Sequence, residues 1–170
     1  MPSFNQETGP GDDSVSRFQA TNVEWVGLSI RQPWIDLILK GIKTIEVRDW
    51  KVARVGPILL HASLTIDWQA IELFGYSNPW DLPRGRLVGY AQIKETSGFT
   101  TESWHESAQQ HLVIRPLKSG DYGTKLENVW TFRKPIACPG KLFFFPIPPN
   151  VMERVREQFP AVDMGRGVSW

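Results

Sequence analysis

The chain has 170 residues, of which 41% are hydrophobic and 22% are charged, a composition typical of one compact domain with its own apolar core. It has no apolar run near the roughly 20 residues that a membrane-spanning helix needs, which excludes an integral membrane protein of that kind. The 19 basic and 18 acidic residues nearly cancel, so the net charge of +1 excludes the broad basic surface that grips long nucleic acids through their phosphates.

Residues 1–22 are polar, contain the stretch GPGDD and show no apolar periodicity, so they are predicted to be a disordered lead-in. An ordered domain is expected over residues 23–160, followed by a short tail over residues 161–170. The first residues lack the basic start and apolar middle of a secretory signal, which predicts a reducing, cytoplasmic setting. In that setting the lone cysteine, Cys138, is expected to be a small buried hydrophobe.

Clear local signals mark the elements of the first half of the domain. Pro33 suits the first turn of a helix, and Gly41 stands where a left-handed cap would end that helix. Gly89 lies inside an apolar run, which indicates a bulge or a close approach of another backbone segment. The pattern predicts, in chain order, a strand at 24–30, a helix at 33–40, strands at 44–50 and 58–63, a helix at 65–75 and a strand at 86–96.

The second half mixes helix and strand patterns in the same way. The pattern predicts a helix at 100–112, a turn-rich connection at 114–125, strands at 128–137 and 141–147, and a helix at 150–159. The strands do not each lead into a crossover helix, which disfavours a parallel sheet. The expected fold is α+β, a small mixed β-barrel of about five to six strands with short surrounding helices.

Eight tryptophans are many for a chain of this length. Most of them are expected in the core or in a half-buried rim, with Trp130 in the core, while one or two in a cleft would form stacking platforms. Arg84 and Arg86, which flank Gly85, are typical of a solvated loop, and a phosphate contact is the alternative.

The stretch GIKTIEVRDW, residues 41–50, combines three charges and a tryptophan with a strand-like pattern. In an extended chain alternate side chains share a face, so Ile45 and Val47 are expected to point into the core. Lys43 is expected in the turn before the strand, because a buried ammonium on the apolar face would be costly. The opposite face then carries Thr44, Glu46, Arg48 and Trp50.

This polar face has two interpretations that the spacing alone does not separate. It is either a solvated sheet face with an ion pair worth at most about 1 kcal/mol, or the wall of a ligand cleft. In a cleft, Lys43 and Arg48 would donate hydrogen bonds and Glu46 would accept them. Trp34 or Trp50 would stack on a planar ring, so the set suits a nucleobase or a nucleotide.

The residues around this stretch resemble the ASCH domain family. Its Gly-x-Lys-x-x-Glu-x-Arg signature follows a short helix, as it does here in GLSIRQPWIDLILKGIKTIEVRDW. The signature residues are Gly41, Lys43, Glu46 and Arg48. The likeness continues more loosely through GPILLHAS, GRLVGYAQI and NVWTFRKPIACPGKLFFFPIP, over about residues 25–149. The resemblance implies a PUA-like β-barrel whose signature lines a cleft, and a role in binding RNA or another nucleic acid.

Two alternative functions stay open beside RNA binding. Some small bacterial members of the family are amidohydrolases that deacetylate N4-acetylcytidine, using a lysine and a threonine of the signature region with a distal glutamate. Lys43 matches that lysine, but Glu46 stands at the threonine position and no distal glutamate is identified. Lys43 and Glu46 would be catalytic only in such an enzyme. The other alternative is a protein-interaction module in which the polar motif only stabilises the fold.

The predicted ligand is RNA, a nucleoside or a nucleotide, with no cofactor and no membrane partner. No metal site is predicted, because the three histidines are scattered along the sequence. Two of the candidate residues also have a structural interpretation: His61 as a hydrogen-bonded core histidine and Trp34 as a tryptophan packed in the core. The candidate ligand-binding residues are Gln32, Trp34, Lys43, Glu46, Arg48, Trp50 and His61.

Overall fold

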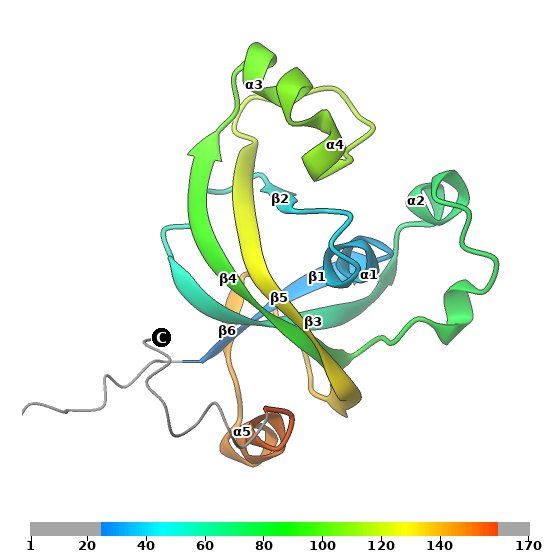
Figure 1. Cartoon of the computed structure of the whole chain (residues 1–170), viewed down its shortest axis with the longest axis vertical. Coiled ribbons are helices and arrows are strands. Elements are labelled where there is room, and N and C mark those ends of the chain that lie inside the picture. The colour runs from blue at the N-terminus through cyan, green and yellow to red at the C-terminus, as the bar shows by residue number, and fades with distance from the viewer. Residues whose placement is uncertain (1–24, 160–170) are drawn as a thin grey trace, which may run out of the picture.

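One mixed six-stranded sheet organises the computed structural model, which describes residues 25–159 (Figure 1). The predicted lead-in at 1–22 and the predicted tail at 161–170 lie outside the described residues. The strands are β1 (Val26–Gln32), β2 (Ile45–Arg48), β3 (Gly56–Ile66), β4 (Arg86–Gly98), β5 (Tyr122–Ala137) and β6 (Phe144–Pro146). The helices of the same region are α1 (Trp34–Leu39), α2 (Trp68–Leu73), α3 (Thr101–Glu106), α4 (Ala108–His111) and α5 (Pro149–Arg156), with a short 3-10 helix, η2 (Pro79–Asp81).

The strand order is β2-β5-β4-β3-β1-β6, and the sheet curls without closing between its two ends. Only β1 and β3 pair in parallel; every other neighbouring pair is antiparallel. Because β6 pairs with Val26 to Leu28 alone, the edge of β1 from Ser29 onward is left without a strand neighbour. The predicted α+β fold is confirmed, and the opening in its curled sheet lies between β2 and this free edge of β1.

Both faces of the sheet are covered by apolar side chains. Ile58 and Leu60 of β3 pack into one cluster with α1, whereas Leu59 between them packs into a second cluster with α5. This is the alternation expected of a strand that is buried on both sides. Cys138 is buried in the second cluster, which confirms its prediction as a small core residue.

A tight turn after α1 positions the start of the signature. Gly41 has φ +71° and ends the helix, as predicted. The backbone N–H groups of Gly41 and Lys43 donate to the carbonyl oxygens of Ile38 and Leu37, at 2.9 and 3.1 Å. Lys43 is therefore held in the turn and not in the strand that follows, as predicted. The turn does not keep its ammonium out of the interior, because Lys43 is only 2% exposed, so the expectation that this position avoids burial is wrong.

The orientation of β2 is the reverse of the prediction. Ile45 and Val47 are only partly buried and join neither apolar cluster, so the expectation that they point into the core is wrong. Glu46, between them, is only 8% exposed. The reason is that β2 pairs with β5 alone, at the edge of the sheet, and turns its polar face inward across the opening toward β1.

Three other predictions in the second half are corrected. β5 begins at Tyr122, within the region predicted as a connection, because residues 122–125 pair with β2, a partner distant in sequence. The helix predicted at 100–112 is divided into α3 and α4 at Ser107. Trp130 is 39% exposed and contacts Phe159, so its assignment to the core is wrong.

Gly89 confirms the close backbone approach expected inside β4. A Cβ atom added at Gly89 would lie 2.4 Å from the carbonyl oxygen of Trp130 and 2.7 Å from Cδ2 of Leu39. The absence of a side chain thus lets α1 and β5 pack against the centre of the sheet.

Candidate functional site

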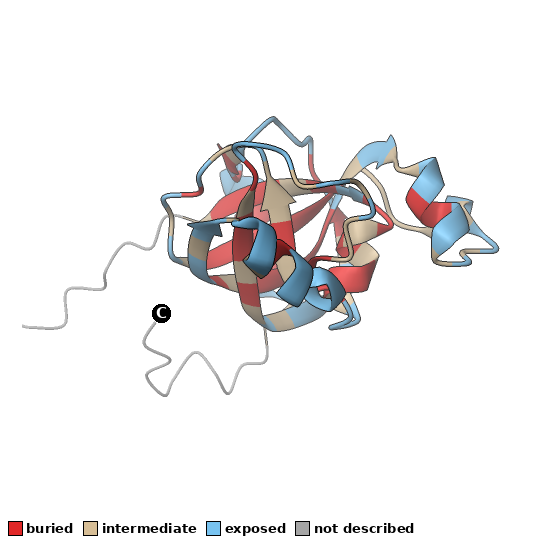
Figure 2. Cartoon of the chain, turned by 90° about the horizontal axis from the view of Figure 1, so that it is seen from above, coloured by how far each residue is buried: buried red, intermediate tan, exposed pale blue. Residues whose placement is uncertain are grey.

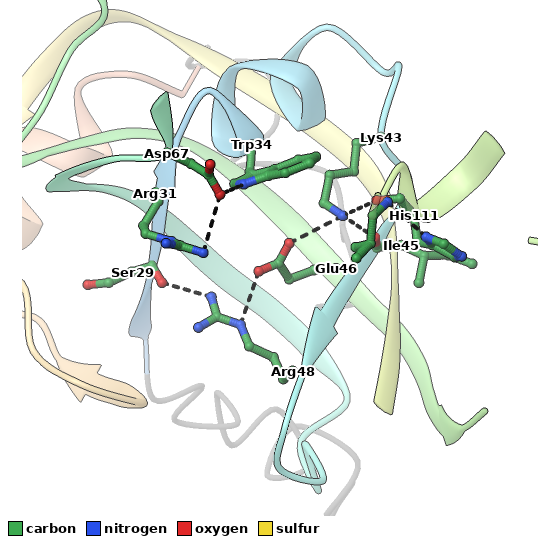
Figure 3. A network of polar contacts seen from close by, with 10 residues as sticks. Ser29, Arg31, Trp34, Lys43, Ile45, Glu46, Arg48, Asp67 and His111 are labelled. Carbon is green, nitrogen blue, oxygen red and sulfur yellow. Dashed lines mark hydrogen bonds and ion pairs between the residues drawn. The ribbon is translucent and has the colours of Figure 1, made fainter. Parts of the chain in front are cut away.

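A cleft of about 490 Å³ opens where the curled sheet fails to close. Its walls come from the free edge of β1, from β2, from the start of α2 and from the connection 113–121 that precedes β5. Figure 3 shows the polar side chains that β1 and β2 direct toward each other across this space. The signature residues therefore lie in the opening of the barrel-like sheet, between its two ends.

Lys43 is buried at one end of the cleft, with 2% of its surface exposed. Its Nζ donates to the carbonyl oxygens of Ile45 at 2.7 Å and His111 at 2.6 Å, and it lies 3.6 Å from Oε2 of Glu46. It also lies 5.3 Å from the centre of the Trp34 ring. Three oxygen acceptors surround an ammonium group that has three N–H donors.

The pKa of Lys43 is lowered by its burial, and the carboxylate of Glu46 works against this effect. Removing the proton from Nζ would leave a lone pair facing one of the three oxygens that surround it. The hydrogen-bond geometry therefore favours the charged ammonium in this arrangement.

Glu46 joins the two cations of the signature. Its Oε1 lies 3.1 Å from Nε of Arg48, while its Oε2 faces Lys43. Arg48 in turn donates from Nη2 to the carbonyl oxygen of Ser29 at 2.8 Å, which links β2 to the free edge of β1. The predicted contact between Glu46 and Arg48 along one strand face is confirmed, and the pair lines the cleft.

Trp34 forms an aromatic wall whose orientation is fixed by Asp67. The indole Nε1 donates to Oδ2 of Asp67 at 3.0 Å, and Arg31 pairs with the same oxygen at 3.4 Å. The other oxygen of Asp67 accepts from the backbone N–H of Ala70 at 3.2 Å and caps α2. One carboxylate thus ties β1, α1 and α2 together at the edge of the cleft.

Sequence reasoning missed the wall formed by residues 113–121. There the guanidinium of Arg115 donates through two nitrogens to the two oxygens of Asp121, both at 2.7 Å. This hydrogen bonding holds the pKa of Asp121 below its ordinary value. Lys118 and Ser119 lie exposed on the same wall. The available signal was a charged connection with turn residues, since binding residues are often carried on such loops.

Residues 28–137, more than half of the chain, match the ASCH domain family. The chain belongs to the ASCH family. None of the curated proteins matches it in sequence.

Solved ASCH structures share the fold of this domain. The crystal structure of the ASCH protein from Zymomonas mobilis superposes with a TM-score of 0.53 at 12% sequence identity, over 79% of this chain and 94% of that one. Two single-substitution variants of the same protein give TM-scores of 0.52, also at 12% identity and over 79% of this chain, with 95% and 97% of the variant chains covered. At this level of identity the likeness concerns the fold of the ASCH domain.

Three of the candidate residues lie away from the ASCH cleft. Gln32 is buried, and its Nε2 donates to the carbonyl oxygen of Pro83 at 2.9 Å. Trp50 packs edge-on against Phe143 and Phe144, because the chain bends after Arg48 and the strand alternation ends there. We therefore leave Gln32 and Trp50 out of the site.

The third, His61, lies beside a separate cavity of about 710 Å³. It is buried between the hydroxyl of Ser29 and the carbonyl oxygen of Cys138, which lie 2.9 Å from Nδ1 and Nε2 respectively. Burial lowers the pKa of His61, and the hydrogen bond to Cys138 opposes this effect. The geometry agrees with the structural interpretation of His61 as a hydrogen-bonded core histidine.

Residues 25–159, the described part of the chain, hold no group of three or more histidine, cysteine, aspartate or glutamate side chains that could bind a metal ion. None of the helices in this part combines the length and the apolarity needed to traverse a lipid bilayer.

His111 is a buried histidine next to the cleft, and its carbonyl oxygen accepts a hydrogen bond from Lys43. Its Nδ1 accepts from the backbone N–H of Val113 at 2.9 Å, and its Nε2 donates to the carbonyl oxygen of Trp104 at 3.0 Å. Burial lowers its pKa; the hydrogen bond to Trp104 raises it, and the charges of Lys43 and Arg115 lower it further. The neutral ring fits both hydrogen bonds.

This arrangement predicts that His111 contributes to loss of stability in acid. The folded pKa lies below the ordinary value of 6.5, so the unfolded chain binds more protons as the pH falls through 6.5, and stability is lost. Each unit of pKa difference contributes about 1.4 kcal/mol. We expect thermal melts at pH 7 and pH 5 to differ less for His111→Gln than for the wild type, because the amide does not titrate. The exposed His105→Gln is the control, and a wild-type pH dependence in His111→Gln would contradict the assignment.

Proposed function

We propose that this ASCH domain binds single-stranded RNA by accepting one unpaired nucleotide in the cleft. The observation that carries the proposal is the buried carboxylate of Glu46, held between Lys43 and Arg48 beside the indole of Trp34. A volume of about 490 Å³ falls within the range of pockets that enclose one small ligand. The opening is therefore suited to a nucleotide and not to a duplex.

The inner part of the cleft matches the edge and the face of a nucleobase. Glu46 supplies an acceptor for an exocyclic amine, and the guanidinium of Arg48 supplies planar donors for a ring carbonyl or nitrogen. Trp34 offers an aromatic wall on which a base can stack, and its tie to Asp67 holds that wall in place without a bound ligand. Because these groups are already ordered, binding costs little conformational entropy.

The rim of the cleft carries cations for the phosphate. Arg31 on β1 and Lys118 on the connection 113–121 are exposed residues of the cleft lining, and Lys118 has no ion pair among the described residues. A phosphate between these walls would gain charge-assisted hydrogen bonds. With few cations available, this contact suits a short single strand better than long duplex nucleic acid.

The protonation state that the surroundings of Lys43 favour suits ligand binding better than amide hydrolysis. An amidohydrolase would require Lys43 to act as a nucleophile or as an acid–base group, which needs an available lone pair or a mobile proton. The three oxygens around Nζ favour an ammonium that orients Glu46. Incubation with N4-acetylcytidine checks this alternative, and release of cytidine would support hydrolysis.

Arg48→Ala tests the binding proposal. We expect it to weaken binding of a fluorescein-labelled six-nucleotide RNA by about 10- to 100-fold, since hydrogen bonds from charged groups contribute about 1.5–3 kcal/mol. Fluorescence anisotropy measures the Kd, and a thermal melt verifies that the variant is folded. The control is Arg156→Ala, an exposed arginine on α5 outside the cleft lining. An unchanged Kd in folded Arg48→Ala protein would rule out this site.

A further inference from the structure

Two exposed tryptophans contact each other edge to face beside the cleft. Trp68 begins α2 and is 52% exposed, and Trp80 lies in η2 and is 66% exposed. Their ring centres are 5.3 Å apart, with the planes inclined at 61°. The guanidinium of Arg84 lies 5.1 Å from the centre of the Trp80 ring. We call these three residues the tryptophan platform.

The tryptophan platform has no evident role in holding the fold together. Trp68 and Trp80 belong to neither apolar cluster, although tryptophan is mostly buried in folded proteins. Figure 1 places α2 and the segment after it to one side of the sheet, and Figure 2 colours about half of the residues there as exposed. Two large aromatic side chains kept in contact with solvent indicate a binding surface.

The platform adjoins the cleft through α2. Asp67 and Gln69, the neighbours of Trp68 in sequence, both line the cleft. Asp67 is also the residue that orients the Trp34 wall. Trp68 is thus one residue in sequence from two residues of the cleft wall, and a ligand that extends out of the cleft on this side would pass close to it.

The chemistry of the platform suits the bases and phosphates of a single strand. Tryptophan faces stack on any base, whatever its hydrogen-bonding edge. Arg84 can stack on a ring and pair with a phosphate at the same time. Residues 67–86, which carry the platform, hold two basic residues (Arg84 and Arg86) and three acidic ones (Asp67, Glu72 and Asp81), so a contact with a phosphate here depends on Arg84 itself.

We infer that Trp68, Trp80 and Arg84 form a second stacking site, which holds the nucleotide next to the one in the cleft. This inference rests on the proposed function and deepens it: the ligand is a strand of two or more nucleotides, and the cleft alone accounts for a mononucleotide. It also assigns Arg84, expected from the sequence to be a solvated loop residue, to the binding surface.

The test compares two ligands on the full chain. Titration calorimetry with the four ribonucleoside monophosphates measures the affinity of the cleft alone. Fluorescence anisotropy with a mixed-sequence six-nucleotide RNA measures the affinity of the cleft and the platform together. We expect Trp68→Ala and Trp80→Ala each to weaken hexanucleotide binding about tenfold and to leave mononucleotide binding unchanged. Trp80→Phe should recover most of the loss, because it keeps an aromatic face.

Controls separate failure of this inference from failure of the proposed function. Trp130→Ala removes another exposed tryptophan outside the cleft and should bind both ligands like the wild type. Wild-type hexanucleotide affinity in Trp68→Ala and Trp80→Ala, with the Arg48 dependence intact, would overturn the platform alone. Equal weakening of both ligands would overturn it too, since the tryptophans would then act through the shape of the cleft. No binding of either ligand to the wild type would overturn both proposals. If a tryptophan variant does not fold, Arg84→Ala tests the same site, with the same weakening of hexanucleotide binding expected.

Discussion

Replacing Glu46 with glutamine is expected to lower the free energy of unfolding by about 3–5 kcal/mol, the range found when one partner of a buried ion pair is removed. The variant leaves the ammonium of Lys43, 2% exposed, without its carboxylate, and removes the partner of Arg48 at 3.1 Å. Because the amide keeps the shape of the side chain, the loss of stability measures the effect of removing the negative charge. Chemical denaturation at pH 7 measures the change.

Two companion variants make the Glu46 result interpretable. Glu127→Gln breaks an exposed pair with Lys94, at 3.5 Å, and should cost about 1 kcal/mol or less. The double variant Lys43→Met with Glu46→Gln should be less destabilised than the sum of its two single changes, because no unpaired ammonium is left buried. If Glu46→Gln proved as mild as Glu127→Gln, the buried network would not hold the cleft together.

Replacing Gly89 with alanine is expected to destabilise the protein by about 3 kcal/mol, the upper part of the usual range for overpacking. The new methyl group would lie 2.4 Å from the carbonyl oxygen of Trp130 and 2.7 Å from the side chain of Leu39. Leu39 can shift, but the Trp130 carbonyl belongs to the β5 backbone beside β4, so the strands must separate. Loss of the close approach would also displace α1, which carries Trp34.

Gly98, in the same strand, provides the matched control. A Cβ atom at Gly98 would lie 3.7 Å from the ring of Tyr122, an ordinary contact distance. We expect Gly98→Ala to change the free energy of unfolding by less than about 1 kcal/mol. Similar denaturation midpoints for the two alanine variants would show that the close contact at Gly89 is relieved without cost.

Short-range patterns in the sequence were sufficient to predict the elements that carry the signature. Helix α1, its glycine end and the turn at Lys43 depend on residues within a few positions of one another. The same holds for Glu46 and Arg48, which share a strand face because alternate side chains do. The family assignment and the α+β class follow from these local patterns and from the match over 28–137.

Alternation along a strand defines two faces but does not say which one is buried, and here the expectation was reversed. The face with Glu46 turns inward because β2 ends a sheet that does not close, so charges meet across the opening. Glu46 tolerates this position only because Lys43 and Arg48 pair with it.

Contacts between distant segments account for everything else about the site. Arg115 and Asp121 form a cleft wall some seventy residues after the signature, and no local pattern connects them to it. Trp50, adjacent to the signature, instead packs on Phe143 and Phe144. Local sequence therefore sets the chemistry of Lys43, Glu46 and Arg48, whereas the curl of the sheet sets what surrounds them, because the path of the chain through space depends on pairing between residues far apart in sequence.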